Sequence, residues 1–120
     1  MRTNVTDVKN ILDNTTLSDP IITGYIDSAN VFVTEYLEPT TLSAIMLEEI
    51  EKWLSAHLIS FTRERMAASE EAGGAKIKYI GVFGKGLDST PYGQTAIMLD
   101  DTGTLLELSA GKKNINITSL

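Results

Sequence analysis

Apolar side chains recur every three or four positions through most of the first 68 residues, which is the spacing of amphipathic helices. This pattern predicts a first helix over about Val5 to Leu12, with Thr3 or Asn4 as its cap. A second helix is predicted to begin at Asp19-Pro20 and to run to about Leu37. The third and longest is predicted from Thr41 or Leu42 to about Ala68. The apolar positions of the second and third helices supply the expected core: Ile26, Phe32, Leu47, Ile50, Trp53, Leu54, Leu58 and Phe61.

The pattern changes after residue 68. A Gly-containing turn precedes residues 75–80, where polar and apolar positions alternate as in a β-strand. Asp88, Ser89 and Thr90 offer N-cap side chains before Pro91, so a short helix is predicted over about Pro91 to Leu99. Another short helical turn is expected around residues 105–108, and residues 114–120 alternate like a strand without a partner.

These elements together predict a mainly α fold. We expect a small helical bundle with three N-terminal helices, a β strand or hairpin segment, a short C-terminal helix and an extended tail. Residues 1–111 would form one helical domain, with the β segment embedded at about 75–94, and residues 112–120 would form the tail.

Composition narrows the class of protein. The 120 residues carry a formal net charge of −6 and include no basic stripe, which argues against tight binding of nucleic acid. The absence of cysteine excludes disulfides, thiolate catalysis and Cys-ligated zinc. The first ten residues lack the apolar region of a signal peptide, and no apolar run has the length of a membrane span.

The candidate chemical groups do not combine into a catalytic site. His57, the single histidine, lies at helical spacing from Trp53 and Phe61 and is interpreted as a core-edge or interface residue. Among Glu48, Glu49 and Glu51, the first and last could share a cation, but the Glu-x-x-His spacing of a carboxylate metal site is missing. We therefore interpret the three acids as a solvated helix face.

Two loop motifs also have simple interpretations. Gly81, Gly84 and Gly86 show the reverse of dinucleotide-fingerprint spacing, and a mobile loop fits them better. Residues 100–103, Asp-Asp-Thr-Gly, lack the downstream acids of a calcium loop and are interpreted as a helix C-terminus followed by a turn. We expect no enzyme activity, no metal and no cofactor.

The order of these parts resembles the head–tail connector (adaptor, or head completion) proteins of tailed bacteriophages. The resemblance begins with LEEIEKWLSAHL at residues 47–58 and continues through SEEAGGAKIKYIG at residues 69–81. Its most specific part is GLDSTPYGQTAIMLD at residues 86–100, which is similar to the family segment G-L-x-x-T-x-Y-G-Q before an apolar helix. The similarity extends from about residue 18 to the end of the chain.

The resemblance implies a structural role in the virion, at the head–tail interface, after assembly in the host cytoplasm. Family members form a ring, typically of about twelve subunits, beneath the portal protein. The ring extends the channel, through which DNA passes without specific binding, and forms the platform for the stopper or tail component. No membrane contact is implied.

The resemblance and the alternating segments together indicate two contact regions. The expected contacts with a neighbouring subunit or the tail component are Lys76, Lys78, Tyr79, Phe83, Lys85, Leu87 and Tyr92. The expected portal-docking residues are Lys112, Lys113, Ile115, Ile117 and Leu120. Unpaired strand edges favour such docking by strand addition.

Two other functions remain open. One is a small helical protein-binding or regulatory module of a phage or mobile element. The other, less favoured, is a metal-dependent hydrolase that would use Glu48 or His57.

Overall fold

The structure, a computed structural model, describes residues 2–12, 15–68 and 85–110. Their secondary structure is helical throughout, which confirms the mainly α prediction. The elements are α1 (Val5–Leu12), α2 (Asp19–Tyr36), α3 (Ala44–Ala68), the 3-10 helix η2 (Lys85–Ser89), α5 (Pro91–Leu99) and α6 (Thr104–Ser109).

The β segment predicted at about 75–94 is only partly open to comparison. Residues 75–84, with the alternating stretch at 75–80, lie outside the described residues, and so does the tail at 112–120. Residues 85–94 are described and form η2 and the start of α5, so the prediction of β structure is wrong there. The Gly and Pro signals in this stretch mark a helical turn and a helix start.

Local side-chain caps explain where two of the helices begin. The Asn4 side chain accepts a hydrogen bond from the Asp7 amide at 2.9 Å and caps α1, as one of the two predicted alternatives. The Ser43 hydroxyl accepts from the Met46 amide at 3.1 Å, which satisfies one of the free amides at the start of α3. The third helix therefore begins two or three residues later than predicted.

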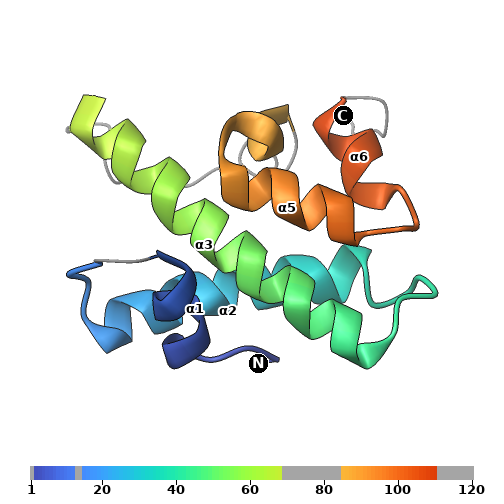
Figure 1. The fold of residues 1–120 in the computed structure, drawn as a ribbon, viewed down its shortest axis with the longest axis horizontal. Coiled ribbons are helices and arrows are strands. Elements are labelled where there is room, and N and C mark those ends of the chain that lie inside the picture. The colour runs from blue at the N-terminus through green and yellow to red at the C-terminus, as the bar shows by residue number, and fades with distance from the viewer. Residues whose placement is uncertain (1, 13–14, 69–84, 111–120) are drawn as a thin grey trace.

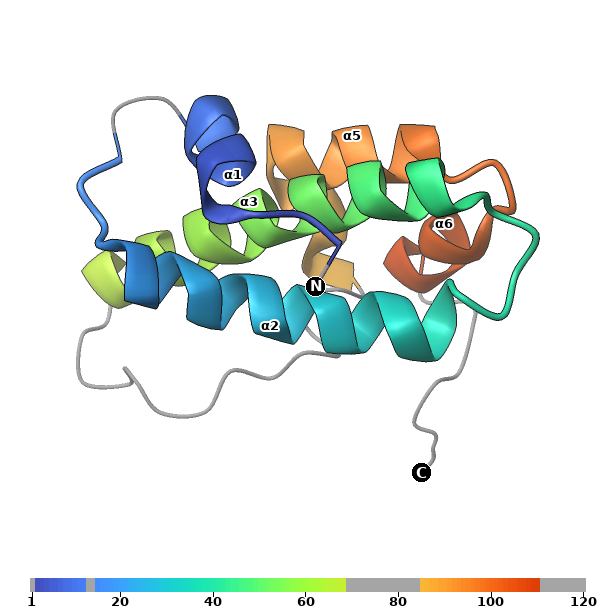
Figure 2. The same cartoon turned by 90° about the horizontal axis from the view of Figure 1, so that it is seen from below.

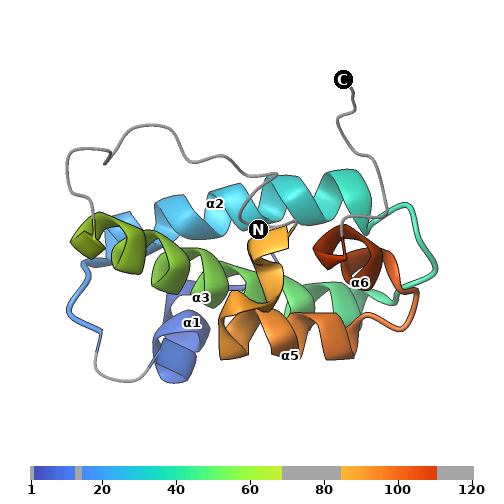
Figure 3. The same cartoon turned by 90° about the horizontal axis from the view of Figure 1, so that it is seen from above.

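The long helix α3 lies at the centre of the molecule. α1 and α2 pack on one side of it, and α5 and α6 lie on the other (Figure 1). Seen from below, α2 runs along the length of the molecule with α1 beside it (Figure 2). Seen from above, α5 and α6 lie in front of α3 (Figure 3). Among the described residues, no helix combines the length and apolar character needed to cross a membrane.

Two separate groups of buried apolar side chains hold the helices together. The main core joins α2, α3, η2, α5 and α6, and a smaller cluster consists of Val8, Ile22, Ile26 and Ile59 between α1, α2 and α3. Each such aliphatic side chain contributes roughly 1.5–3 kcal/mol when fully buried. Six of the predicted core residues are buried: Ile26, Phe32, Leu47, Ile50, Leu54 and Leu58. Trp53 and Phe61 are only partly buried and pack against the edge of the main core.

Candidate functional site

The segment 86–100, which carries the most specific part of the resemblance, folds as one unit on α3. η2 leads into Thr90, whose extended backbone ends the turn, and Pro91 follows at the start of α5. The Thr90 side chain accepts a hydrogen bond from the Gly93 amide at 3.0 Å. Of the three N-cap candidates, Thr90 is therefore the cap.

His57 connects this unit to α3. Its Nδ1 atom lies 2.7 Å from Thr90 Oγ1, so one buried hydrogen bond joins the middle of α3 to the cap of α5. The His57 ring also lies against Phe61, with 5.6 Å between the ring centroids. The side chain is fully buried, so its predicted place at the core edge or at an interface is wrong. His57 instead acts as a polar link inside the fold.

Gly93 allows α5 to approach η2 and α3 closely. A Cβ atom at this position would lie 1.8 Å from the carbonyl oxygen of Leu87 and 3.0 Å from His57 Nδ1. The first distance is far below van der Waals contact and involves backbone, so no side chain can be accommodated without moving η2. Gly93 was not among the residues predicted for the site, although a glycine inside a predicted helix is itself a signal of close packing.

Leu87 and Tyr92 were both predicted to contact a neighbouring subunit or the tail component. Leu87 is fully buried in the main core, so it cannot make that contact and that prediction is wrong. Its apolar side chain instead seats η2 on the helices beneath. Tyr92 is partly exposed and stacks on Trp53 of α3, with 6.4 Å between the ring centroids. Only Tyr92 of these two remains available at the surface of the unit.

The other predicted contact residues are not brought together by the described structure. Lys85 is the first residue of η2, and its side chain lies outside the described part of the structure. The remaining subunit-interface and portal-docking residues lie outside the described residues: Lys76, Lys78, Tyr79, Phe83, Lys112, Lys113, Ile115, Ile117 and Leu120. Their predicted contacts stay predictions.

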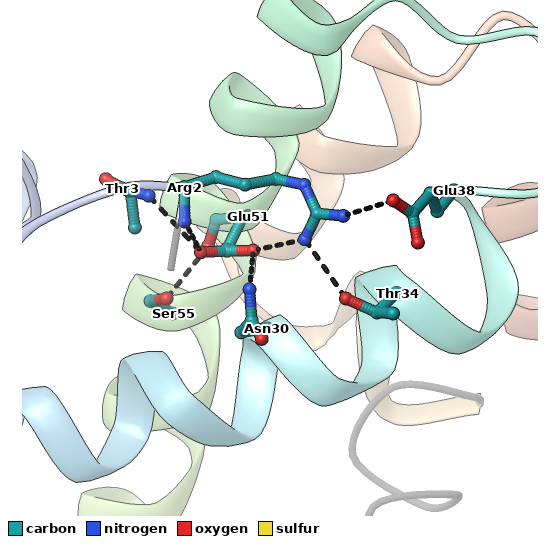
Figure 4. A network of polar contacts seen from close by, with 7 residues as sticks. All are labelled: Arg2, Thr3, Asn30, Thr34, Glu38, Glu51 and Ser55. Atoms are coloured by element: carbon teal, nitrogen blue, oxygen red, sulfur yellow. Dashed lines mark hydrogen bonds and ion pairs between the residues drawn. The ribbon is translucent and has the colours of Figure 1, made fainter.

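The acidic residues of α3 do not form a uniform solvated face. Glu48 is exposed, but Glu51 is fully buried, so the prediction for Glu51 is wrong. Its carboxylate is enclosed by donors from Arg2, Thr3 and Asn30 (Figure 4). Glu49 forms an ion pair with Lys52, at 3.0 Å. Glu48 and Glu51, whose spacing could have allowed a shared cation, are thus divided between solvent and core.

The Asp-Asp-Thr-Gly stretch caps a helix. Asp100 Oδ2 accepts a hydrogen bond from the Leu105 amide at 2.8 Å, and Asp100 Oδ1 accepts from the Thr102 amide at 3.0 Å. Gly103 takes a left-handed backbone with φ of 80°, which favours glycine at this turn. The interpretation as a turn after α5 is confirmed, and Asp100 additionally holds the start of α6. In the part of the chain that the structure describes, no three side chains gather as a metal site would require.

No protein-family model, no curated protein and no solved structure matches the chain. The arrangement offers a rigid surface for contacts: a cap, a glycine and a buried histidine fix α5 at one angle on α3.

Proposed function

We propose that this chain is a structural virion protein, a ring-forming head–tail connector that binds beneath the portal of a tailed phage. It extends the DNA channel and provides the platform for the stopper or tail. The observation that carries the proposal is the way in which residues 86–100 are fixed on α3. The residues that resemble the connector family are the ones held rigidly on α3 by Thr90, Gly93 and His57.

A fixed α5 suits a ring. Each subunit of a closed ring must present its two contact surfaces at one defined angle, because an angular error repeats at every interface and prevents closure. The hydrogen bond from His57 of α3 to Thr90 is buried and short, and Thr90 also caps α5, so the cap holds this angle. The close packing of Gly93 against Leu87 also restricts movement of α5 relative to η2.

The charge of the described fold supports a channel for DNA. The basic side chains that the structure describes, Arg2, Lys9 and Lys52, each form an ion pair with an acid. Many acids are exposed: Asp19, Asp27, Glu35, Glu38, Glu48, Asp88, Asp101 and Glu107. A surface with this excess of negative charge repels the phosphate backbone and lets DNA slide past.

The other basic residues of the chain are grouped along the sequence. Besides the three paired ones, they occur only at 63–85 and 112–113: Arg63, Arg65, Lys76, Lys78, Lys85, Lys112 and Lys113. Five of these seven are predicted contact residues. Basic segments meeting the acidic helices of the next subunit would give a head-to-tail contact, the type of interface that builds rings.

The test is binding to the portal protein encoded by the same genome. We expect full-length protein to co-sediment with purified portal, and the variant lacking residues 112–120 to keep its helical circular dichroism but lose portal binding. The double variant Lys76→Glu/Lys78→Glu should fail to form rings, whereas Lys9→Glu, at an exposed ion pair, should form them normally.

Two results would overturn the proposal or part of it. Undiminished portal binding by the truncated protein would refute docking through the tail. A full-length protein that stays monomeric and ignores the portal would refute the connector role and favour the protein-binding or regulatory module.

A further inference from the structure

Residues 2–12 form a strap that is held apart from the main core. A short non-helical stretch from Arg2 to Asn4 leads into α1, and α1 packs on α2 and α3 through Val8. The buried cluster around Val8 is separate from the main core that joins α2, α3, η2, α5 and α6. The strap can therefore leave its place without opening the main core.

A buried carboxylate receives the start of the strap. Glu51 Oε2 accepts hydrogen bonds from the backbone amides of Arg2 at 2.9 Å and Thr3 at 3.2 Å. Glu51 Oε1 accepts from Arg2 Nη1 at 3.0 Å and from Asn30 Nδ2 at 3.1 Å (Figure 4). Three of these four donors come from the strap. Without the strap, the Glu51 carboxylate would keep only Asn30 of these four donors.

The Arg2 side chain also contacts α2 and the residues that follow it. Its guanidinium donates to Thr34 Oγ1 at 3.2 Å and pairs with Glu38 at 3.5 Å. Glu51, Asn30, Thr34 and Glu38 thus form an anionic and polar receptor for one arginine and two backbone amides. Beside it, Ile22, Ile26 and Ile59 receive the apolar side of α1. We call these seven residues the acceptor site.

Within the part of the chain that the structure describes, one polar atom of the docked strap lacks a hydrogen-bond partner. The Thr3 hydroxyl oxygen is buried and has no hydrogen-bond partner among the described residues. Burying an unsatisfied hydroxyl costs on the order of 1–3 kcal/mol, so docking of the strap is weaker than its other contacts suggest. A strap docked below its full strength leaves its place more often, and each opening exposes the acceptor site to the strap of another copy.

We infer that the acceptor site binds the strap of a second copy of this chain, so that Arg2 of one subunit completes the Glu51 site of another. The occupant is specified by the site itself: the buried carboxylate requires an arginine with consecutive amides, and the isoleucine cluster requires the apolar face of α1. Exchange of identical elements adds no new type of contact and is a low-cost route to association. It requires neither portal nor tail component.

Within one chain the strap competes at an effective concentration in the mM range, so exchange is expected where copies crowd together or where the chain's own strap is weakened. The second condition can be created by a single substitution. Arg2→Glu places a carboxylate beside Glu51 and Glu38 and should release the strap of its own chain. Lys9→Glu makes the same change in charge on the strap, but at an ion pair exposed on both sides.

The absence of cysteine in the chain allows a clean readout. The substitution Ile26→Cys puts a thiol probe under the strap, and Ala96→Cys puts one in the main core. We expect Arg2→Glu to raise the labelling rate of the probe at position 26 by at least about tenfold through local opening, and to leave the probe at position 96 protected. Lys9→Glu should change neither rate by more than about twofold.

Strap exchange is then measured by mixing. The acceptor is full-length Arg2→Glu protein with the probe at position 26, and the strap donor is cysteine-free Glu51→Gln protein, whose own site is weakened. At donor concentrations of about 0.5 mM, we expect the labelling rate of the acceptor to fall at least about twofold. Concentrations this high are needed because a strap tethered in its own chain acts at an effective concentration in the mM range. The double variant Arg2→Glu/Glu51→Gln should give no protection.

Each other outcome overturns the inference. An unchanged labelling rate on mixing would show that the site takes only its own strap. Labelling at position 96 in the Arg2→Glu protein would show that the strap is integral to the main core. No effect of Arg2→Glu on position 26 would show that the Arg2–Glu51 pair does not hold the strap.

Discussion

His57 Nδ1 and Thr90 Oγ1 lie 2.7 Å apart in the interior, although 33 residues separate them in sequence. The same hydroxyl caps α5 by accepting from the Gly93 amide. One threonine side chain therefore both starts a helix and fastens it to α3. The rigid unit on which the proposed connector role depends is built around this pair.

Removing the Thr90 hydroxyl should destabilise the fold. Thr90→Ala loses the N-cap, worth about 1 kcal/mol, and leaves the buried His57 nitrogen without this partner, worth a further ~1–3 kcal/mol. We expect a loss of about 2–4 kcal/mol in the free energy of unfolding, measured by urea unfolding with the fluorescence of the single tryptophan as the signal. Thr90→Ser keeps the hydroxyl and should lose less than about 1 kcal/mol. Equal losses in the two variants would argue against the hydrogen bond.

Adding one methyl group at two glycines should have opposite effects. Gly93→Ala forces a Cβ into the backbone of Leu87 and should cost about 2–3 kcal/mol or more as overpacking. Gly24→Ala lies inside α2, where nothing lies within 4 Å of the added Cβ, and should stabilise by about 0.5–1 kcal/mol. Thermal unfolding of both variants beside the wild type checks this contrast. A Gly93→Ala variant as stable as the wild type would contradict the observed seating of α5.

Replacing the buried Thr3 hydroxyl by a methyl group should stabilise the strap. Thr3→Val removes an oxygen that is buried without a partner and keeps the shape of the side chain. We expect a gain of about 1 kcal/mol in unfolding and slower hydrogen exchange of the α1 amides. The matched change Thr6→Val, at an exposed position of α1, should give no such gain. A destabilised Thr3→Val protein would show that the hydroxyl is satisfied in solution.

The stacked pair Trp53 and Tyr92 should couple α5 to α3 at the surface of the unit. A double-mutant cycle with Trp53→Leu and Tyr92→Leu is expected to give a coupling energy of about 0.5–1.5 kcal/mol. Because Trp53 is only partly buried, each single substitution should cost less than the truncation of a core aromatic residue. Circular dichroism during urea unfolding measures all four proteins, and a coupling energy near zero would mean that the two rings do not interact.

Helices defined by local signals were predictable from the sequence. The bounds of α1 and α5 match the expected ones because apolar spacing and a cap residue agree at their ends. The start of α3 was misplaced because Leu42 continues the apolar pattern, while the true cap is Ser43. Here the hydrogen bond of a single side chain overrides the periodicity.

Long-range contacts were not predictable from the sequence. Glu51 lies among surface acids in the sequence, and its burial depends on Arg2, 49 residues away. Likewise, the full burial of His57 and Leu87 follows from the fold of residues 85–99 back onto α3, which no local pattern specifies. Local patterns specify the helices, whereas polar partners distant in sequence decide which charged side chains enter the core.

The most direct test of the proposed role is negative-stain electron microscopy of the purified protein mixed with its portal protein. The proposal predicts closed rings of this chain stacked coaxially on the portal, with an open central channel. Portal particles without an added ring, at protein concentrations that saturate any specific binding, would contradict it.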